Sequence, residues 1–179
     1  MNFIETPIEG LIIVEPRVFN DARGCFFESF SLREFRRATG LHYIDFVQDN
    51  ESHSTRGVIR GLHFQRGDNA QAKLVRVTTG TVLDVALDLR PGSATYGRYF
   101  AVELSADNRR QLFLPRGFAH GFSVLSDNAV LQYKVDNYYR PESEGGISPT
   151  DPTLAIDWRV DPSSAILSPK DLALPPFQP

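Results

Sequence analysis

The sequence predicts an all-β protein, an antiparallel jelly-roll β-barrel with short peripheral helices. Short β-prone runs recur along the chain, turn-forming clusters separate them, and no helical periodicity lies between them. A parallel βαβ fold would need helical crossovers between its strands, and this spacing does not provide them. The expected strands are 11–14, 25–30, 46–50, 58–64, 73–79, 81–89, 99–104, 111–114, 118–125 and 129–136.

The N-terminal part of the chain has the shortest strand signals. The run 11–14 lies between Pro7 and Pro16, so we expect an edge strand or an arm that pairs elsewhere. After a turn at 21–24, the run 25–30 is rich in aromatic residues. We expect three of these side chains in the core: Phe26, Phe27 and Phe30.

One helix is predicted in the first 150 residues, over 31–40. Ser31 and Glu34 have the spacing of a capping box, and Leu32 and Phe35 share one helical face. Gly40 can end the helix in the left-handed conformation.

The run 81–89 alternates strictly and shows how one strand divides its side chains between two faces. Leu83, Val85 and Leu87 share one face, while Asp84 and Asp88 share the other with small apolar residues. We therefore expect both aspartates to face solvent.

The C-terminal 40 residues have a different composition from the predicted barrel. Beyond residue 139, Pro, Ser, Gly and Asp dominate and the strand rhythm stops. We expect 140–179 to wrap the barrel as loops and short helical turns, with Trp158 as an anchor. No linker divides the chain, so 1–179 is predicted to be one domain.

Composition excludes several classes of protein. The chain has 179 residues, a net charge of -3 and a pI near 5.8, which argues against a nucleic-acid surface. The single Cys25 excludes an internal disulfide and a cysteine-rich metal site. No signal-peptide pattern or membrane-spanning apolar run is present. We expect a cytoplasmic enzyme or binding protein with no membrane partner.

The stretch 60–65, followed by 71–75, places a titratable imidazole close to two cations. His63 is the natural proton acceptor near neutral pH, and a turn at 67–69 would bring Lys73 onto the neighbouring strand. Strict alternation puts Arg60 and His63 on opposite faces of one strand, so either a bulge at Gly61 turns one of them or Arg60 serves a different part of the site. A histidine on a strand can also be purely structural.

The stretch 115–122 contains Pro-x-Gly-x-x-His, which resembles the second sequence motif of the cupin β-barrels. The first cupin motif requires a His-x-His pair, whereas this chain has Gln65 where the second histidine would stand. His42 and His53 lie in polar surroundings and do not complete a three-ligand set, so no metal site is predicted. His120 either lines the site or is a hydrogen-bonded core histidine.

Three tyrosines and one aspartate are further candidates for catalytic or binding residues. Tyr133, Tyr138 and Tyr139 follow one another at the end of the last long strand, where a phenol can donate a proton or stack on a base. Asp171 lies far away in sequence, and from the residues alone a solvated carboxylate is the default. If the tail folds back, Asp171 would instead fix the tautomer of His63.

Together, these stretches resemble the dTDP-4-dehydrorhamnose 3,5-epimerases. The resemblance runs from about residue 10 to about residue 172, in order and at consistent spacing. The stretches that carry it are DARG at 21–24, FFES at 26–29, FVQDN at 46–50, RGLHFQ at 60–65, QAKLVR at 71–76, LPRGFAHGF at 114–122, YK at 133–134, NYY at 137–139, EGGI at 144–147 and LAIDW at 154–158.

The resemblance implies a cofactor-independent epimerase on a cupin-like jelly roll, acting on a dTDP-sugar as a homodimer with exchanged N-terminal strands. On the family's pattern His63 is the general base paired with Asp171, Tyr133 is the general acid, and Lys73 stabilises an enolate. Positions that match substrate-binding residues are Arg23, Glu28, Gln48, Asn50, Arg60, His120, Tyr138, Glu144 and Lys170.

The chemistry of such a substrate agrees with these residue types. In a 4-keto-6-deoxyhexose both C3 and C5 are α to the carbonyl, so one base and one cation can serve both centres without a cofactor. Two alternatives remain: an epimerase of C3 or C5 alone (or a 4-ketohexose isomerase) on a related dTDP-sugar, and a barrel that binds nucleotide-sugars without turnover.

Overall fold

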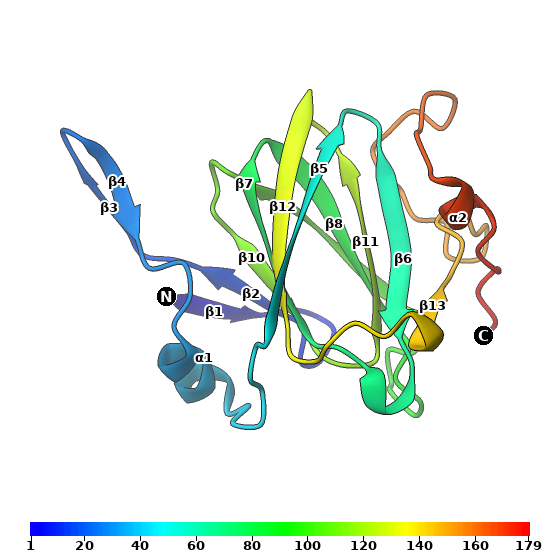
Figure 1. The fold of residues 1–179 in the computed structure, drawn as a ribbon, viewed down its shortest axis with the longest axis horizontal. Coiled ribbons are helices and arrows are strands. Elements are labelled where there is room, and N and C mark those ends of the chain that lie inside the picture. The colour runs from blue at the N-terminus through cyan, green and yellow to red at the C-terminus, as the bar shows by residue number, and fades with distance from the viewer.

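Two antiparallel sheets packed face to face form the body of the protein (Figure 1). The computed structural model describes all 179 residues. The six-stranded sheet has the order β1-β2-β10-β7-β12-β5 and the five-stranded sheet the order β13-β6-β11-β8-β9. The strands are β1 Asn2–Glu5, β2 Ile12–Glu15, β3 Val18–Asp21, β4 Gly24–Phe27, β5 Gln48–Thr55, β6 Ile59–Gln65, β7 Lys73–Thr79, β8 Thr81–Asp88, β9 Tyr99–Ser105, β10 Gln111–Leu114, β11 Phe118–Val124, β12 Asn128–Val135 and β13 Glu144–Gly146. The predicted all-β jelly roll is confirmed.

The N-terminal strands differ from the sequence prediction. β1 and β3 were not expected, and β2 lies between β1 and β10, so the sheet edge is β1 and not β2. The hairpin of β3 and β4 projects away from the barrel (Figure 1). Phe26 on this hairpin is 72% exposed and Phe27 is half-buried, so their predicted place in the core is wrong. Only Phe30 packs inward, edge-on against Phe46.

The helix α1 (Leu32–Thr39) forms for the reasons that its sequence suggests. The Ser31 side chain accepts a hydrogen bond from the backbone N–H of Glu34, and Gly40 ends the helix with φ of 70°. Phe35 is buried and packs edge-on against Phe113 of β10, which fixes the helix against the six-stranded sheet.

The strand β8 is buried on both faces, which overturns the expectation for its aspartates. Val82 belongs to the core between the two sheets, whereas Leu83 packs with Trp158 on the opposite face of the strand. Asp84 and Asp88 are therefore 0% exposed, and the prediction that they face solvent is wrong. Strict alternation was correct, but both aspartates share the face of Val82 and Ala86, which lies between the two sheets. The C-terminal segment covers the opposite face, that of Leu83 and Val85.

The segment 140–179 runs along the five-stranded sheet as loops, two short helices and β13 (Figure 1). The short helices are the 3-10 helix Pro141–Ser143 and α2 (Pro169–Leu172). Trp158 is buried and donates its indole N–H to the carbonyl of Pro149, so its predicted role as an anchor is confirmed. None of the helices is long and apolar enough to cross a membrane.

Candidate active site

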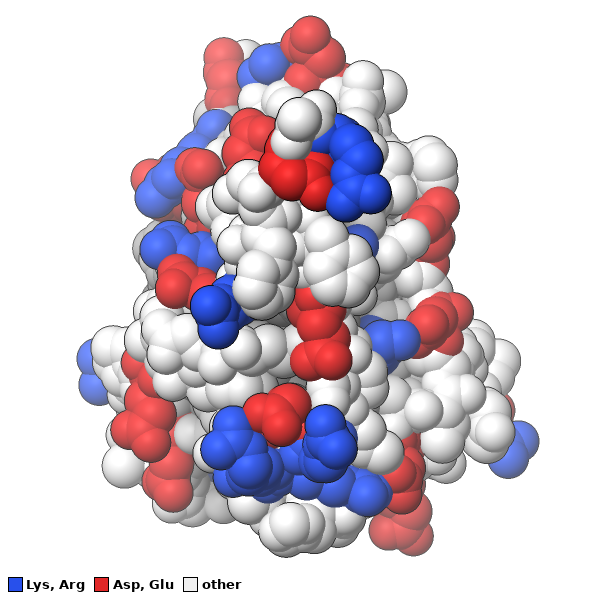
Figure 2. Space-filling view, turned by 90° about the vertical axis from the view of Figure 1, so that its left-hand side faces the viewer, with Lys and Arg blue, Asp and Glu red and all other residues white.

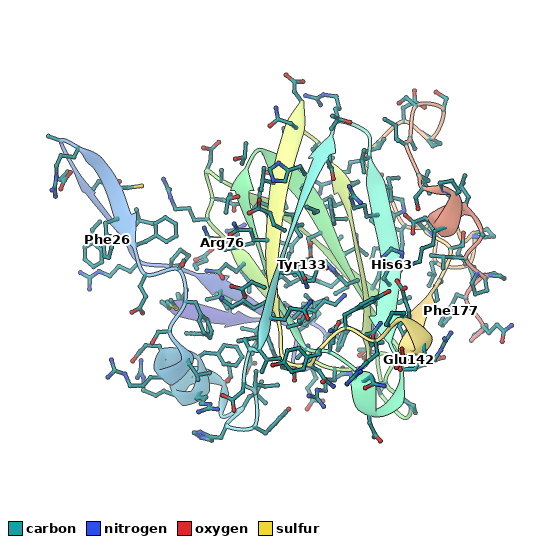
Figure 3. All side chains as sticks on the ribbon, in the orientation of Figure 1. Phe26, His63, Arg76, Tyr133, Glu142 and Phe177 are labelled. Carbon is teal, nitrogen blue, oxygen red and sulfur yellow. The ribbon has the colours of Figure 1, made fainter.

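One cavity of about 340 Å³ brings together most of the predicted site residues. Strands β6 and β11 of one sheet, β7 and β12 of the other, and the C-terminal segment all contribute to its wall. Figure 3 shows Tyr133 on β12 and His63 on β6, the strands that bring the two sheets to this cavity. The predicted residues that line it are Arg60, His63, Lys73, His120, Tyr133, Glu144, Lys170 and Asp171.

His63 and Asp171 form a buried pair. The Nε2 atom of His63 lies 2.6 Å from Oδ1 of Asp171, whose side chain is 4% exposed. Ser168 caps α2 and accepts a hydrogen bond from the backbone N–H of Asp171, which fixes the carboxylate. The tail does fold back, so the default of a solvated Asp171 is wrong.

The ionisation of His63 suits a general base. Burial lowers the pKa of the imidazole below its usual value, and the carboxylate of Asp171 opposes this effect without reversing it. The ring is therefore mainly neutral at pH 7. With Nε2–H donated to Asp171, Nδ1 keeps a free lone pair that can accept a proton.

Lys73 and Tyr133 are also buried, with opposite consequences for their charge. Burial lowers the pKa of Lys73 to about 8, although Asp84 and Glu144 favour its charged form. The pKa of Tyr133 is raised, chiefly by burial, so the phenol keeps its proton at neutral pH. The Lys73 ammonium lies 5.8 Å from the Tyr133 ring centroid, so a cation and a proton donor face the same space.

His120 is held in the same way as His63, by a carboxylate behind it. Its Nε2 lies 2.9 Å from Oδ2 of the fully buried Asp84, and its ring also lines the cavity. Both readings of His120 therefore apply, since it is a hydrogen-bonded core histidine and a site residue. Nowhere in the chain do three or more His, Cys, Asp or Glu side chains form a group that could hold a metal ion.

A β-bulge places Arg60 and His63 in one cavity. The register between β6 and β11 shifts between His120 and Phe122, opposite Gly61. Gly61 has φ of 111°, and a Cβ added there would lie 2.6 Å from the Cα of Gly121. Arg60 donates to the Ser54 hydroxyl at 3.0 Å and keeps donor capacity toward the cavity. Of the two alternatives that the sequence left open, the structure shows the bulge at Gly61.

The mouth of the cavity is organised by Glu144. Lys170 lies 2.5 Å from one of its oxygens, and the Tyr139 hydroxyl donates to the other at 2.8 Å. Burial disfavours the Glu144 carboxylate, but these two hydrogen bonds outweigh it and lower its pKa. Tyr138, the tyrosine that the sequence favoured, is 59% exposed and does not line the cavity.

Besides Tyr138, four predicted binding residues lie outside this cavity. Arg23 is exposed on the projecting hairpin, where it pairs with Asp21 at 2.6 Å, and Glu28 follows the same hairpin. Gln48 donates to Asn50 on β5 at 2.8 Å, and Asn50 lines an adjoining pocket of about 290 Å³ that shares Tyr133. A single chain therefore does not bring all the predicted binding residues together in this cavity.

Sequence reasoning missed several residues of the cavity wall. Gln71 is two positions before Lys73, so the period of a strand could have identified it. Others lie inside the stretches quoted in the sequence analysis but were not singled out there as site residues: Phe64, Gln65, Gly121, Phe122 and Tyr139. Ser52 and Ser168 had no signal, because long-range packing alone brings them to the cavity.

An antiparallel jelly roll that holds an imidazole, a phenol and a buried ammonium around one cavity has the groups of a proton-transfer enzyme. Comparison with known proteins agrees with this. Residues 5–179 match the family model of the dTDP-4-dehydrorhamnose 3,5-epimerases. The chain is 57% identical over 171 residues to the enzyme of that name from Escherichia coli, covering 96% of this chain and 91% of the relative.

Solved structures give the same result. A dTDP-4-dehydrorhamnose 3,5-epimerase from Elizabethkingia anophelis superimposes with a TM-score of 0.95 at 50% identity, over 99% of this chain and 96% of that one. The corresponding epimerase from Legionella pneumophila, in complex with dTDP-4-keto-L-rhamnose, gives a TM-score of 0.91 at 46% identity over 99% of both chains. The chain belongs to the dTDP-4-dehydrorhamnose 3,5-epimerase family.

Proposed function

We propose that the chain inverts C3 and C5 of dTDP-4-dehydro-6-deoxy-D-glucose to give dTDP-4-dehydro-L-rhamnose. The observation that carries this proposal is the neutral, carboxylate-paired His63 in one cavity with a protonated Tyr133, whose ring centroid lies 5.8 Å from the Lys73 ammonium. Membership of the epimerase family supports the same substrate. The reaction needs neither a cofactor nor a metal ion, because the substrate's own carbonyl acidifies both centres.

Each inversion takes two proton transfers. His63 accepts the proton from C3 or C5, and the electrons of the C–H bond pass into an enolate whose charge lies on O4. The Lys73 ammonium stabilises that oxygen, and removing one such donor often costs about 3 to 4 kcal/mol. The Tyr133 hydroxyl then delivers a proton to the opposite face of the carbon. Exchange with solvent restores the phenol and the imidazole.

The nucleotide is held at the mouth of the cavity and by a second copy of the chain. Arg60 and Lys170 supply cations for the diphosphate. The projecting hairpin carries Arg23 and leads to Glu28, and its Phe26 is largely exposed, which supports a homodimer in which hairpins are exchanged. Each hairpin would then complete the other subunit's site, together with Gln48 and Asn50.

The surface charge and the cysteine content support two further expectations, that the protein does not bind nucleic acid and that it lies in the cytoplasm. At the hairpin end of the molecule, basic and acidic side chains are interspersed (Figure 2), without the continuous basic stripe of a nucleic-acid surface. Cys25 is an exposed free thiol, which suits a reducing compartment, and we propose the cytoplasm.

Incubation with dTDP-4-dehydro-6-deoxy-D-glucose in D2O, followed by NMR of the sugar, tests this function. We expect deuterium at C3 and C5 and conversion to the L-rhamno product. His63→Asn should abolish both exchange and inversion, whereas Tyr133→Phe should exchange deuterium into recovered substrate and make little epimer. Circular dichroism confirms that the variants fold.

The outcomes separate the alternatives. Deuterium at one carbon alone would indicate an epimerase of C3 or C5, and none at either carbon would indicate a binding protein. If exchange and inversion fall by the same factor in Tyr133→Phe, the general acid is another group.

A further inference from the structure

Asp136 lies where the elements that carry Lys73, Tyr133 and His120 meet. It directly follows β12, the strand of Tyr133, and its side chain is 1% exposed. One carboxylate oxygen accepts the backbone N–H of Ala72 at 2.6 Å. Its own backbone N–H donates to the carbonyl of Ala72 at 3.2 Å, so both polar groups of Ala72 are bound by a single residue.

The second carboxylate oxygen of Asp136 binds a third part of the fold. It accepts Nε–H of Arg116 at 2.8 Å, and Arg116 lies in the loop between β10 and β11 that leads to His120. Asp136 thus connects β7, β12 and the β10–β11 loop, which come from separate parts of the chain. No atom of Asp136 lines the cavity itself.

Lys73 depends on its backbone for its position more than the other site residues do. His63 and His120 are each held by a carboxylate, whereas no carboxylate lies within ion-pair distance of the Lys73 ammonium. Lys73 is the first residue of β7, where its backbone pairs with Leu114 of β10 and Val135 of β12. The residue just before it is Ala72, the one that Asp136 binds at both N–H and C=O.

We infer that Asp136, with Arg116, is a positioning residue that holds the Lys73 ammonium where the enolate oxygen develops. This inference rests on the proposed role of Lys73. A group aimed at developing charge contributes only when its place is fixed beforehand, and partners behind such groups commonly matter 10- to 100-fold.

The test compares the rate of deuterium incorporation at C3 and C5 in single and double variants. Asp136→Ala should lower this rate by about 10- to 100-fold. Arg116→Met should lower it less, because the bonds to Ala72 remain. In a Lys73→Met background, Asp136→Ala should lower the rate of deuterium incorporation by less than a further factor of about two, because the ammonium that Asp136 positions is already absent.

Asp88→Ala is the matched control. Asp88 is also fully buried and is bound by an arginine, Arg90, at 2.9 Å, but its side-chain hydrogen bonds go to the 90–95 loop and none goes to Ala72 or Arg116. The Asp88→Ala variant should lose thermal stability, while its folded fraction incorporates deuterium into the sugar at the wild-type rate. If Asp136→Ala does not fold, Arg116→Met replaces it in the comparison of single and double variants, since Arg116 is 44% exposed and its loss leaves the core intact.

Each outcome has a distinct meaning. The positioning role would be overturned if Asp136→Ala, or Arg116→Met, lowered the rate of deuterium incorporation by the same factor in the wild-type and Lys73→Met backgrounds. It would also be overturned if Asp88→Ala lowered that rate as much as Asp136→Ala does. Wild-type exchange in Lys73→Met would instead overturn the proposed role of Lys73. A loss that disappears in the Lys73→Met background supports the inference.

Discussion

Asp171→Asn is the substitution that tests the His63 dyad most directly. The carboxylate lies 2.6 Å from Nε2 of His63 in a nearly closed site, so its charge stabilises the imidazolium that forms when the base accepts a proton. A hydrogen bond to a charged group contributes about 1.5 to 3 kcal/mol. Since 1.36 kcal/mol is tenfold in rate, we expect kcat/KM to fall by about 10- to 100-fold.

The pH dependence has a definite sign. Asp171 raises the pKa of His63 against the larger effect of burial, so removing its charge lowers that pKa further. The acidic limb of the kcat/KM profile should therefore move to lower pH, because the weaker base keeps its lone pair free in more acidic solution. The assay is kcat/KM across pH 5 to 9, with Asp161→Asn on the exposed surface as a control. A profile identical to that of the wild type would refute the dyad.

Three further predictions concern the rest of the site. Arg60→Lys should raise KM, because an ammonium replaces a guanidinium fork on the diphosphate; unchanged kcat and KM would exclude Arg60 from binding. Exhaustive chelation with EDTA should leave activity intact, and loss that a divalent metal restores would contradict the cofactor-free reaction. Activity should fall as pH rises through about 8, where Lys73 loses its proton, and Lys73→Met should remove this limb from its residual activity.

The sequence predicted the elements of the barrel well, because alternation and turn chemistry are local properties. It predicted the end of β5 less well: the strand continues past Asn50 to Thr55, through polar residues that an edge strand tolerates. The expectation for Phe26 failed because aromatic content indicates burial, whereas Phe26 lies on a hairpin that projects from the barrel.

The candidate site was predictable where its residues lie in the sheets and unpredictable where tertiary contacts decide. His63, Lys73 and Tyr133 sit on strands whose faces follow from spacing. Asp84 could not be assigned to His120, because alternation alone does not tell which face of β8 lies between the two sheets. Nor could spacing choose Tyr139 over Tyr138, since both lie beyond the last strand.

Lys73 should also make the folded protein less stable than it could be. Burial lowers its pKa from 10.5 to about 8, which corresponds to about 3 kcal/mol of destabilisation when the ammonium is fully charged. Lys73→Met should therefore raise the free energy of unfolding at pH 7 by about 1 to 3 kcal/mol, as is common when a functional group is replaced.

The pH dependence distinguishes this cost from a simple packing effect. The unfolded chain keeps the proton up to its ordinary pKa while the folded chain loses it near 8, so wild-type stability recovers as pH rises between these values and the advantage of Lys73→Met shrinks. Urea unfolding at pH 7 and pH 10 measures this difference. Lys134→Met is the control, because Lys134 is paired with Asp49 at the surface and should show no such gain. If Lys73→Met proved less stable than the wild type at pH 7, the ammonium would be compensated in the folded state, and burial would not lower its pKa.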